Sequence, residues 1–405
     1  MLGGASRETW SFSYDGRPLV LRRDPPGSVR SGGLAREAAL MTSARAAGVP
    51  APEVVAAAPE HLVMTRLFGE TLARRILRDD DYAGARAVLV AQCADALARL
   101  HRDVDPVAGL PDQPDPVAAL RDVLDQLGEP HPVFELGLAR LARTRPTARE
   151  RRVVHGDFRL GNLMVDPTGL VGVLDWELAH LGDPAEDLGW LCVRSWRFGG
   201  AQPVAGVGAR DELLTAYADA GGAAVTADEL AWWELYGTVR WGVICGQQAA
   251  MHLSGAVRSV ELAAVGRRAA EVELDVLELL APSVVAEALR DRDDPETSPS
   301  LPDRPAAGEL LEAVDEWVAG LALTGHPAFE ARVVRRVLAI VARELEFGPA
   351  LAAAHQRRLA RLGVPDDTAL AAQVRAGRDD AGLVGALVSA AVGKLRVADP
   401  SQLAR

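Results

Sequence analysis

The feature that most constrains this chain is a pair of short apolar runs that each lead into a carboxylate. One run starts at Val153 and ends in a polar loop that carries Asp157, and the second, Val171–Leu174, is followed directly by Asp175. Asn162 stands five residues after Asp157. Two carboxylates and an amide on short loops between small strands are the equipment of metal-dependent phosphoryl transfer.

The composition limits the class of protein. A chain of 405 residues is long for one core and predicts two or three domains. The formal charge of −12 argues against nucleic acid or an anionic membrane as the main partner. Three Cys without a CxxC or Cys/His pattern predict neither a disulfide framework nor a zinc site, and they fit a reducing cytoplasm. We see no signal peptide and no apolar run of membrane-spanning length, so we expect a cytoplasmic protein.

Basic residues are distributed unusually. Lys394 is the only lysine, whereas arginine is abundant. Any permanent side-chain cation in the catalytic half of the chain must therefore be an arginine.

The first 68 residues predict a small sheet with one helix. Alternating apolar residues and the turn signal Asp15-Gly16 predict a hairpin. Gly and Pro residues after position 47 predict a helix end. The expected strands are Trp10–Tyr14, Pro18–Arg23, Val54–Ala58 and His61–Thr65, and the expected helix is Leu34–Ala47.

Most of the remaining chain predicts helices. Helical spacing of apolar residues indicates segments at 85–101, 115–127, 134–144, 187–193, 211–218, 226–251 and 257–280. Residues 283–304 have the Pro-rich, charged composition of a linker. Beyond them, two apolar stripes predict an all-helical module, one from Leu310 to Leu321 and one from Val334 to Leu345.

Seven motifs, in a specific order and spacing, characterise the chain up to about residue 282. They are Gly3–Ser6, Val20–Arg23, Arg36-Glu37, Val63–Gly69, His155–Asn162, Leu174–Glu177 and Gly182–Asp187. Together they resemble the aminoglycoside phosphotransferase-like branch of the protein-kinase-like fold. Within it, the chain is similar to phosphotransferase-family proteins related to the kinase-like domain of certain acyl-CoA dehydrogenases. On the segments Arg332–Arg336 and Ile340–Leu345, the tail resembles a helical domain of unknown function.

This resemblance implies an α+β, bilobal fold followed by a small all-α domain. The expected ranges are 1–68 for a β-rich N-lobe, 69–282 for a helical C-lobe, 283–304 for a linker and 305–405 for the helical domain. The family usually has a longer segment before its glycine turn, so either the true start lies upstream or the small lobe is trimmed.

The resemblance assigns roles around the opening segment. Asp157 would accept the proton of the substrate hydroxyl, and Arg159 would stabilise charge at the γ-phosphate. Asn162 and Asp175 would bind Mg²⁺ through oxygen atoms. Each residue also has a purely structural alternative. Asp157 and Asn162 could be turn residues, Asp175 could cap a strand end, and Arg159 could be a surface arginine.

On the nucleotide side, the resemblance places ATP between the two lobes. Arg22 would take the position where kinases usually have a lysine, and Glu37 would fix it, although a solvated Arg and Glu are the alternative. Gly3, Gly4 and Ser6 would form the turn over the phosphates. Backbone groups of Thr65 and Leu67 would meet adenine.

The other polar residues near the site are expected to have structural roles. We expect His155, Asp183 and Asp187 to hold the loops together, and His180 to lie behind the site rather than bind a ligand. On the helix at 226–251, Trp232, Trp233 and Tyr236 fit core packing better than contacts with the acceptor, although both stay open.

The sequence thus predicts an ATP- and Mg²⁺-dependent O-phosphotransferase acting on a small hydroxylated molecule. A hydroxy-acid or hydroxyacyl-CoA is slightly favoured over an aminoglycoside or a sugar. One alternative is a nucleotide-binding module with weak turnover, and a poorer one is a metal hydrolase built on His155, Asp157, Asp175 and His180. The expected partners are the acceptor and, as one option, a second copy in a homodimer, with no nucleic acid and no membrane.

Overall fold

A computed structural model describes residues 7–24, 33–290 and 305–404. The chain forms two compact units: residues 1–116 with 145–237, and residues 117–144 with 238–405. The four domain ranges expected from the sequence stay a prediction beside this division. Within the described residues, no helix has both the length and the apolarity needed to cross a membrane.

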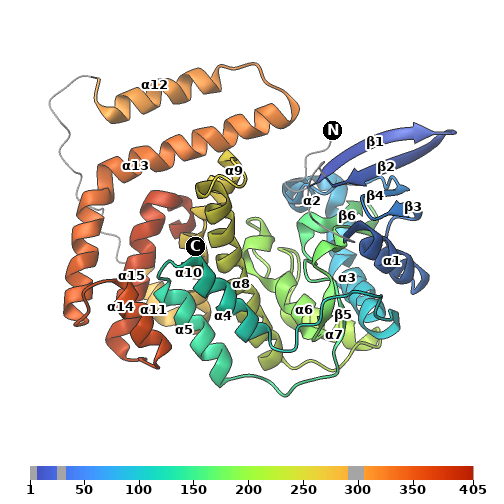
Figure 1. The fold of residues 1–405 in the computed structure, drawn as a ribbon, viewed down its shortest axis with the longest axis horizontal. Helices are drawn as coiled ribbons and strands as arrows, with labels where there is room; N and C mark the ends of the chain where they lie inside the picture. Colours follow the sequence, from blue (N-terminus) through green and yellow to red (C-terminus); the bar gives the residue numbers. More distant parts are fainter. Residues whose placement is uncertain (1–6, 25–32, 291–304, 405) are drawn as a thin grey trace. The chain divides into compact units, whose positions relative to one another are not determined.

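The first unit starts with an antiparallel sheet of four strands in the order β1-β2-β4-β3 (Figure 1). Asp15 and Gly16 both have positive φ, at 49° and 74°, which is the backbone of the tight hairpin that the Asp-Gly pair predicts. Helix α1 packs on the sheet and buries Leu34, Leu40 and Met41. The strands are β1 (Glu8–Tyr14), β2 (Arg17–Arg23), β3 (Val54–Ala58) and β4 (His61–Thr65), and the helix is α1 (Gly33–Ala46).

The rest of the first unit is mostly helical, with two small two-stranded sheets at its centre. Strand β5 pairs with β8, and β6 pairs with β7, both antiparallel. Helix α3 packs against β5 and β7 and so supports the loops that connect these strands. The elements are α2 (Ala73–Arg78), α3 (Ala83–Asp103), β5 (Arg152–Val154), β6 (Leu163–Asp166), β7 (Gly169–Val173), β8 (His180–Gly182), α6 (Ala185–Cys192), α7 (Arg210–Asp219) and the first part of α8 (Ala227–Leu253).

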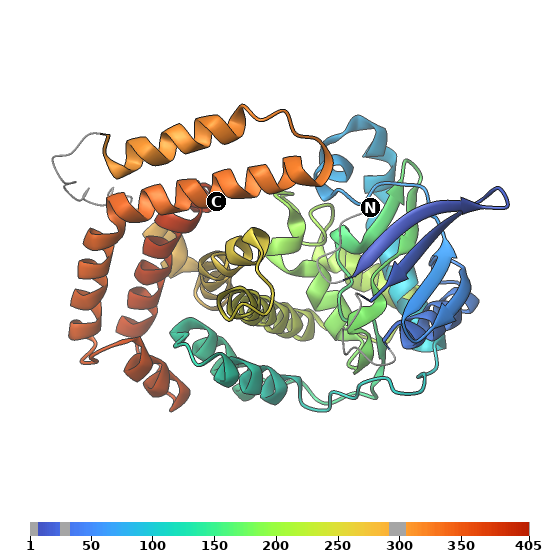
Figure 2. The same cartoon turned by 45° about the horizontal axis from the view of Figure 1, so that its top comes forward.

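The second unit is all helical among its described residues. Helices α12 and α13 run side by side, and α15 packs between α13 and α10 (Figures 1 and 2). The helices are α4 (Pro116–Leu127), α5 (Pro132–Arg143), the end of α8, α9 (Val260–Gly266), α10 (Ala269–Leu280), α11 (Pro282–Arg290), α12 (Ala307–Ala319), α13 (Gly325–Arg361), α14 (Asp367–Arg375) and α15 (Ala381–Ala398).

Two expectations differ from the structure. The helix expected over 257–280 is interrupted between Gly266 and Ala269, so it forms α9 and α10. Residues 283–290, at the start of the expected linker, belong to helix α11, which buries Val285 and packs against α10 and α15. Proline suits the first turn of a helix, which fits Pro282 at the start of α11. The remainder of that range, 291–304, lies outside the described residues.

Candidate active site

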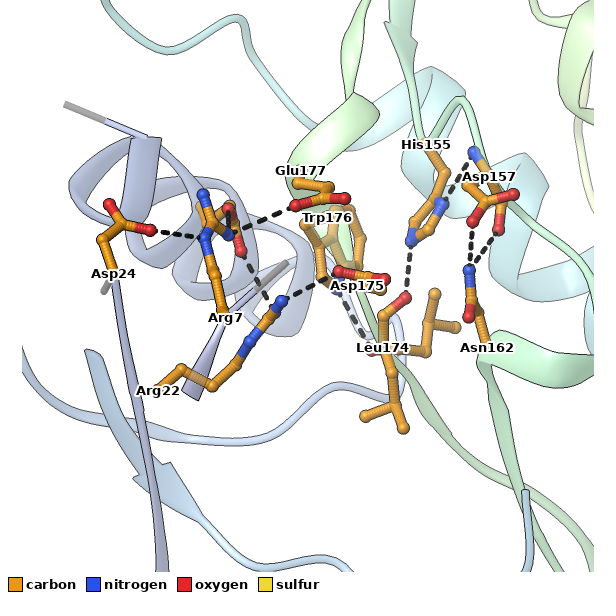
Figure 3. A network of polar contacts seen from close by, with 12 residues as sticks. Arg7, Arg22, Asp24, His155, Asp157, Asn162, Leu174, Asp175, Trp176 and Glu177 are labelled. Carbon is orange, nitrogen blue, oxygen red and sulfur yellow. Dashed lines mark hydrogen bonds and ion pairs between the residues drawn. The ribbon is translucent and has the colours of Figure 1, made fainter. Parts of the chain in front are cut away.

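The carboxylate of Asp157 is held from both sides. Its Oδ1 accepts hydrogen bonds from Arg159 Nε and from Trp190 Nε1, both at 2.9 Å. Its Oδ2 accepts from Asn162 Nδ2 at 2.5 Å (Figure 3). The Arg159 guanidinium also lies over the Trp196 ring, 4.7 Å from its centre. These donors fix the direction of a carboxylate whose side chain is only 13% exposed.

The backbone of the loop before Asp157 is anchored by Asp187, which is fully buried. Its two oxygens accept from the amides of His155 at 2.7 Å and Gly156 at 2.9 Å, and Oδ2 also lies 3.1 Å from His101 Nε2. Burial disfavours its charge, but the His101 contact and the amide hydrogen bonds hold the pKa of Asp187 below its usual value. Asp187 therefore positions the loop, the role that the sequence favoured.

His155 connects the two loops of the site. Its Nδ1 accepts from the Asp157 amide at 3.2 Å, and its Nε2–H donates to the Leu174 carbonyl at 3.1 Å (Figure 3). Burial lowers the pKa of His155, so the ring is neutral at pH 7. Both ring nitrogens serve the structure of the loops.

Strand pairing brings Asn162 and Asp175 to the same end of the β6–β7 ribbon. Leu163 pairs with Val173, and the Leu174 amide donates to the Asn162 carbonyl at 2.9 Å. Asp175 follows with φ 64° and ψ 67°, a left-handed conformation that is rare for a residue with a side chain.

The donor set fits a magnesium ion. The amide nitrogen of Asn162 donates to Asp157, so its oxygen faces the other way, and no described residue donates to that oxygen. Asp175 adds carboxylate oxygens from a side chain that is 35% exposed. Mg²⁺ prefers such oxygen ligands, in small number when phosphates supply others.

Arg22 joins the small sheet to this metal side. Its guanidinium donates to Glu37 Oε2 at 3.2 Å and to Asp175 Oδ1 at 3.0 Å. The Glu37 side chain is 1% exposed, so it is a fixed acceptor. The structure thus pairs Arg22 with Glu37, as the sequence predicted, and adds a contact between Arg22 and Asp175 that the sequence did not predict.

Sequence reasoning missed Arg7, which is buried next to Arg22. Arg7 forms ion pairs with Glu37, with Asp24 at 2.8 Å and with Glu177 at 3.6 Å (Figure 3). Burial, together with the nearby carboxylates, raises the pKa of Glu177 despite Arg7. The one signal in the sequence is an arginine three residues before the predicted strand Trp10–Tyr14, in a chain half that has no lysine.

The remaining nucleotide-side residues stay predictions. Gly3, Gly4 and Ser6 lie outside the described residues. The Thr65 amide donates to the Glu53 carbonyl at 2.9 Å, so it is already used by the sheet. The Leu67 amide makes no hydrogen bond to a described residue, which leaves it as the better hinge donor of the two.

Neither histidine of the hydrolase alternative is arranged as a metal ligand. The ring nitrogens of His155 contact backbone groups, and those of His180 contact the Leu178 carbonyl at 2.9 Å and Glu186 at 3.1 Å.

On α8, Trp233 and Tyr236 are buried. The Trp233 backbone lies so close to Gly189 that a side chain there would clash, which favours the packing interpretation.

Comparison with known proteins decides the family. The model of the phosphotransferase enzyme family matches residues 2–233, which is more than half of the chain. The chain belongs to this phosphotransferase family. A second model, a domain of unknown function (DUF6285), matches residues 321–402, so the expected tail domain is confirmed.

Relatives agree with this family and its branch. Mouse acyl-CoA dehydrogenase family member 10 is 29% identical over 208 residues, which are 47% of this chain and 20% of the mouse protein. Rat acyl-CoA dehydrogenase family member 11 is 26% identical over 207 residues, 46% of this chain and 27% of the rat protein. The chain therefore matches only about a quarter or less of these relatives' own length.

A solved structure shows the fold. An aminoglycoside phosphotransferase candidate from Ralstonia eutropha is 22% identical, with a TM-score of 0.56, over 68% of this chain and 90% of that chain. The predicted protein-kinase-like α+β fold is confirmed.

Proposed function

We propose that this phosphotransferase transfers the γ-phosphate of ATP to a hydroxyl group of a small molecule, with Mg²⁺ as cofactor. The observation that carries the proposal is that the two amide atoms of Asn162 have separate roles. Its amide nitrogen orients the Asp157 carboxylate, and its amide oxygen faces away from Asp157, where no described residue donates to it. One side chain thus links the group that handles the proton to the predicted metal ligands.

In the proposed reaction, the acceptor oxygen attacks the γ-phosphorus, the bond to the β–γ bridging oxygen breaks and ADP leaves. Asp157 orients the hydroxyl and takes its proton. Arg159 donates to Asp157 and supplies positive charge beside the acceptor oxygen. Asn162 and Asp175 would hold the metal, which when bound neutralises phosphate charge.

Charge favours an acceptor that is anionic or neutral. Arg159 lies against Asp157, and Arg22 lies against Asp175, so both carboxylates already have a cation beside them. A polycationic aminoglycoside would have to approach both arginines. The relation to acyl-CoA dehydrogenase family members points the same way, toward a hydroxy-acid or hydroxyacyl-CoA acceptor.

The test separates binding from chemistry. We expect ATP to raise the melting temperature only with Mg²⁺, and Asp175→Ala to abolish this shift. Asp157→Asn should keep the shift and lose ADP release in an acceptor panel that includes hydroxy-acids, CoA thioesters, sugars and aminoglycosides. ATP binding that ignores Mg²⁺ and Asp175, or turnover that survives Asp157→Asn, would contradict the proposal.

One observation favours a second candidate, a nucleotide-binding module with weak turnover. The planar guanidinium group of Arg22 binds both Glu37 and Asp175, whereas kinases usually have a lysine at this position. If Mg²⁺-dependent ATP binding is intact and no member of the panel releases ADP above background, this candidate replaces the enzyme.

A further inference from the structure

A hollow of about 390 Å³ lies among the helices of the second unit, and none of its lining residues belongs to the candidate active site. Helices α10, α13 and α15 form its walls, and α13 and α15 lie side by side there (Figures 1 and 2). Its volume falls in the usual range for small-molecule sites, about 300–1,000 Å³.

Small residues keep the hollow open. Gly348 and Ala352 on α13 and Ala390 and Gly393 on α15 line it, and none carries a side chain long enough to fill it. Gly348 stands next to Pro349, which cannot donate a helical hydrogen bond and bends helices. The lining therefore offers a short apolar surface.

Three carboxylates line the hollow, and each already has a cationic or histidine partner. Glu344 pairs with Arg267 at 2.9 Å. Both oxygens of the buried Glu273 accept from Lys394 Nζ at 2.8 Å. Asp367 Oδ2 lies 2.9 Å from His355 Nε2. A cationic ligand would have to displace one of these partners, so the carboxylates do not call for one.

Arg358 lines the hollow, and its side chain has no hydrogen-bond or ion-pair partner among the described residues. It is partly buried, its Nε makes no hydrogen bond, and no described carboxylate lies within ion-pair distance of its guanidinium. Burial, together with the charges of Arg357 and Arg361, lowers the pKa of Arg358. Since it has no partner, the guanidinium is free to form charge-assisted hydrogen bonds with an anion in the hollow.

We propose that this hollow binds a small organic anion, whose carboxylate or phosphate group pairs with Arg358 and whose short apolar body lies against the Gly and Ala residues of α13 and α15. Lys394 borders the site as a charged group. Although burial disfavours the ammonium, Glu273 raises the pKa of Lys394 above its usual value. The amine is therefore protonated and no covalent bond to the ligand is formed.

The single lysine makes the test direct. Protein labelled with ¹⁵N,¹³C-lysine carries one reporter side chain, Lys394, at the edge of the hollow. We expect butyrate or monobutyl phosphate to shift its NMR signals saturably without ATP. Butanol and butylammonium, which share the apolar body but not the anion, should not. The tighter of the two anions identifies the head group, and inorganic phosphate shows whether the apolar body is needed.

Variants distinguish this site from general charge effects. Arg358→Gln should weaken binding of the anion at least tenfold, whereas Arg357→Gln, an exposed neighbour on the same helix, should leave it unchanged. Ala352→Leu fills the hollow without altering charge and should also abolish binding. The absence of a saturable shift with either anion, or equal binding by the wild type and Arg358→Gln, overturns the proposal. Neither result bears on the proposed kinase activity.

Discussion

The Arg22 guanidinium donates a hydrogen bond to the Asp175 carboxylate at 3.0 Å, across 153 residues of sequence. Through this contact, strand β2 reaches the loop that follows β7. Because Asp175 is a predicted metal ligand, the arginine neutralises an oxygen that a metal would use. Arg22 and a metal ion at Asp175 are therefore expected to compete when no nucleotide is present.

Replacing Arg22 by Met should move two affinities in opposite directions. Mn²⁺ binding without nucleotide, followed by electron paramagnetic resonance, should tighten because Asp175 loses its cation. Affinity for ATP with Mg²⁺, measured by calorimetry, should fall at least about tenfold, the scale of one lost charge-assisted hydrogen bond. Arg23→Met on the same strand removes an exposed pair with Glu8 and should change neither. Parallel changes in both affinities would contradict the competition.

Arg7 should matter for stability more than any exposed arginine of the same sheet. Arg7→Met leaves Asp24 and part of the charge of Glu37 buried without a partner, which should lower the unfolding free energy by about 3 kcal/mol. The control is Arg17→Met, whose pair with Glu53 at 3.4 Å is about half exposed on both sides and should cost less than about 1 kcal/mol. Urea unfolding of both variants checks the difference, and equal losses would refute it.

Local signals explain what could be predicted of the fold. The Asp15-Gly16 turn and the alternating strands around it depend on neighbouring residues only, and β3 and β4 have the bounds expected from the sequence. The placement of Asn162 and Asp175 at the same end of the β6–β7 ribbon could also be predicted, because only a short hairpin separates them.

What could not be predicted depends on contacts between distant segments. His101 meets Asp187 across 86 residues, and Trp190 reaches Asp157 across 33. Neither pairing has a spacing that marks it in the sequence. Helix α11 was missed for a related reason: its Pro-containing segment becomes helical through packing against α10 and α15, which its composition does not reveal.

The buried Asp187 predicts a pH dependence of stability. Its folded pKa lies below the unfolded value of about 3.9, so the stability it contributes is complete above about pH 5 and is lost as the pH falls through the folded pKa. In Asp187→Asn, an NH₂ donor replaces one of the two acceptor oxygens and faces a loop amide N–H, which should cost about 3–5 kcal/mol at pH 7. In urea unfolding, this difference should shrink below about pH 4.

Asp183 supplies a control in which the pH dependence of stability should have the opposite sign. Burial raises the pKa of Asp183, so stability linked to its protonated form is present below the unfolded pKa and is lost as the pH rises through the folded pKa. Asp183→Asn should therefore gain stability relative to the wild type as the pH rises. If the two variants respond to pH in the same direction, the assignment of their environments is wrong.

Replacing Gly156, in the loop before Asp157, by any residue with a side chain should be strongly destabilising. Its φ is +74°, and an added Cβ would lie 2.4 Å from the Leu178 carbonyl oxygen, a backbone atom that cannot rotate away. Gly109 has φ +73° with no atom within 4 Å of the added Cβ, so Gly109→Ala measures the backbone strain alone. That strain is about 1–2 kcal/mol, and the clash should add about 1–3 kcal/mol in Gly156→Ala.

The Gly156→Ala clash also has a functional consequence, because relieving it means moving the loop away from Leu178. The loop carries the amides that bind Asp187 and leads directly into Asp157. Gly156→Ala should therefore reduce phosphoryl transfer while Mg²⁺-dependent ATP binding persists, since Arg22 and Asp175 lie on other segments. Thermal unfolding and ATP calorimetry on both glycine variants check this. Equal stability of the two variants would show that the loop accommodates a side chain at position 156.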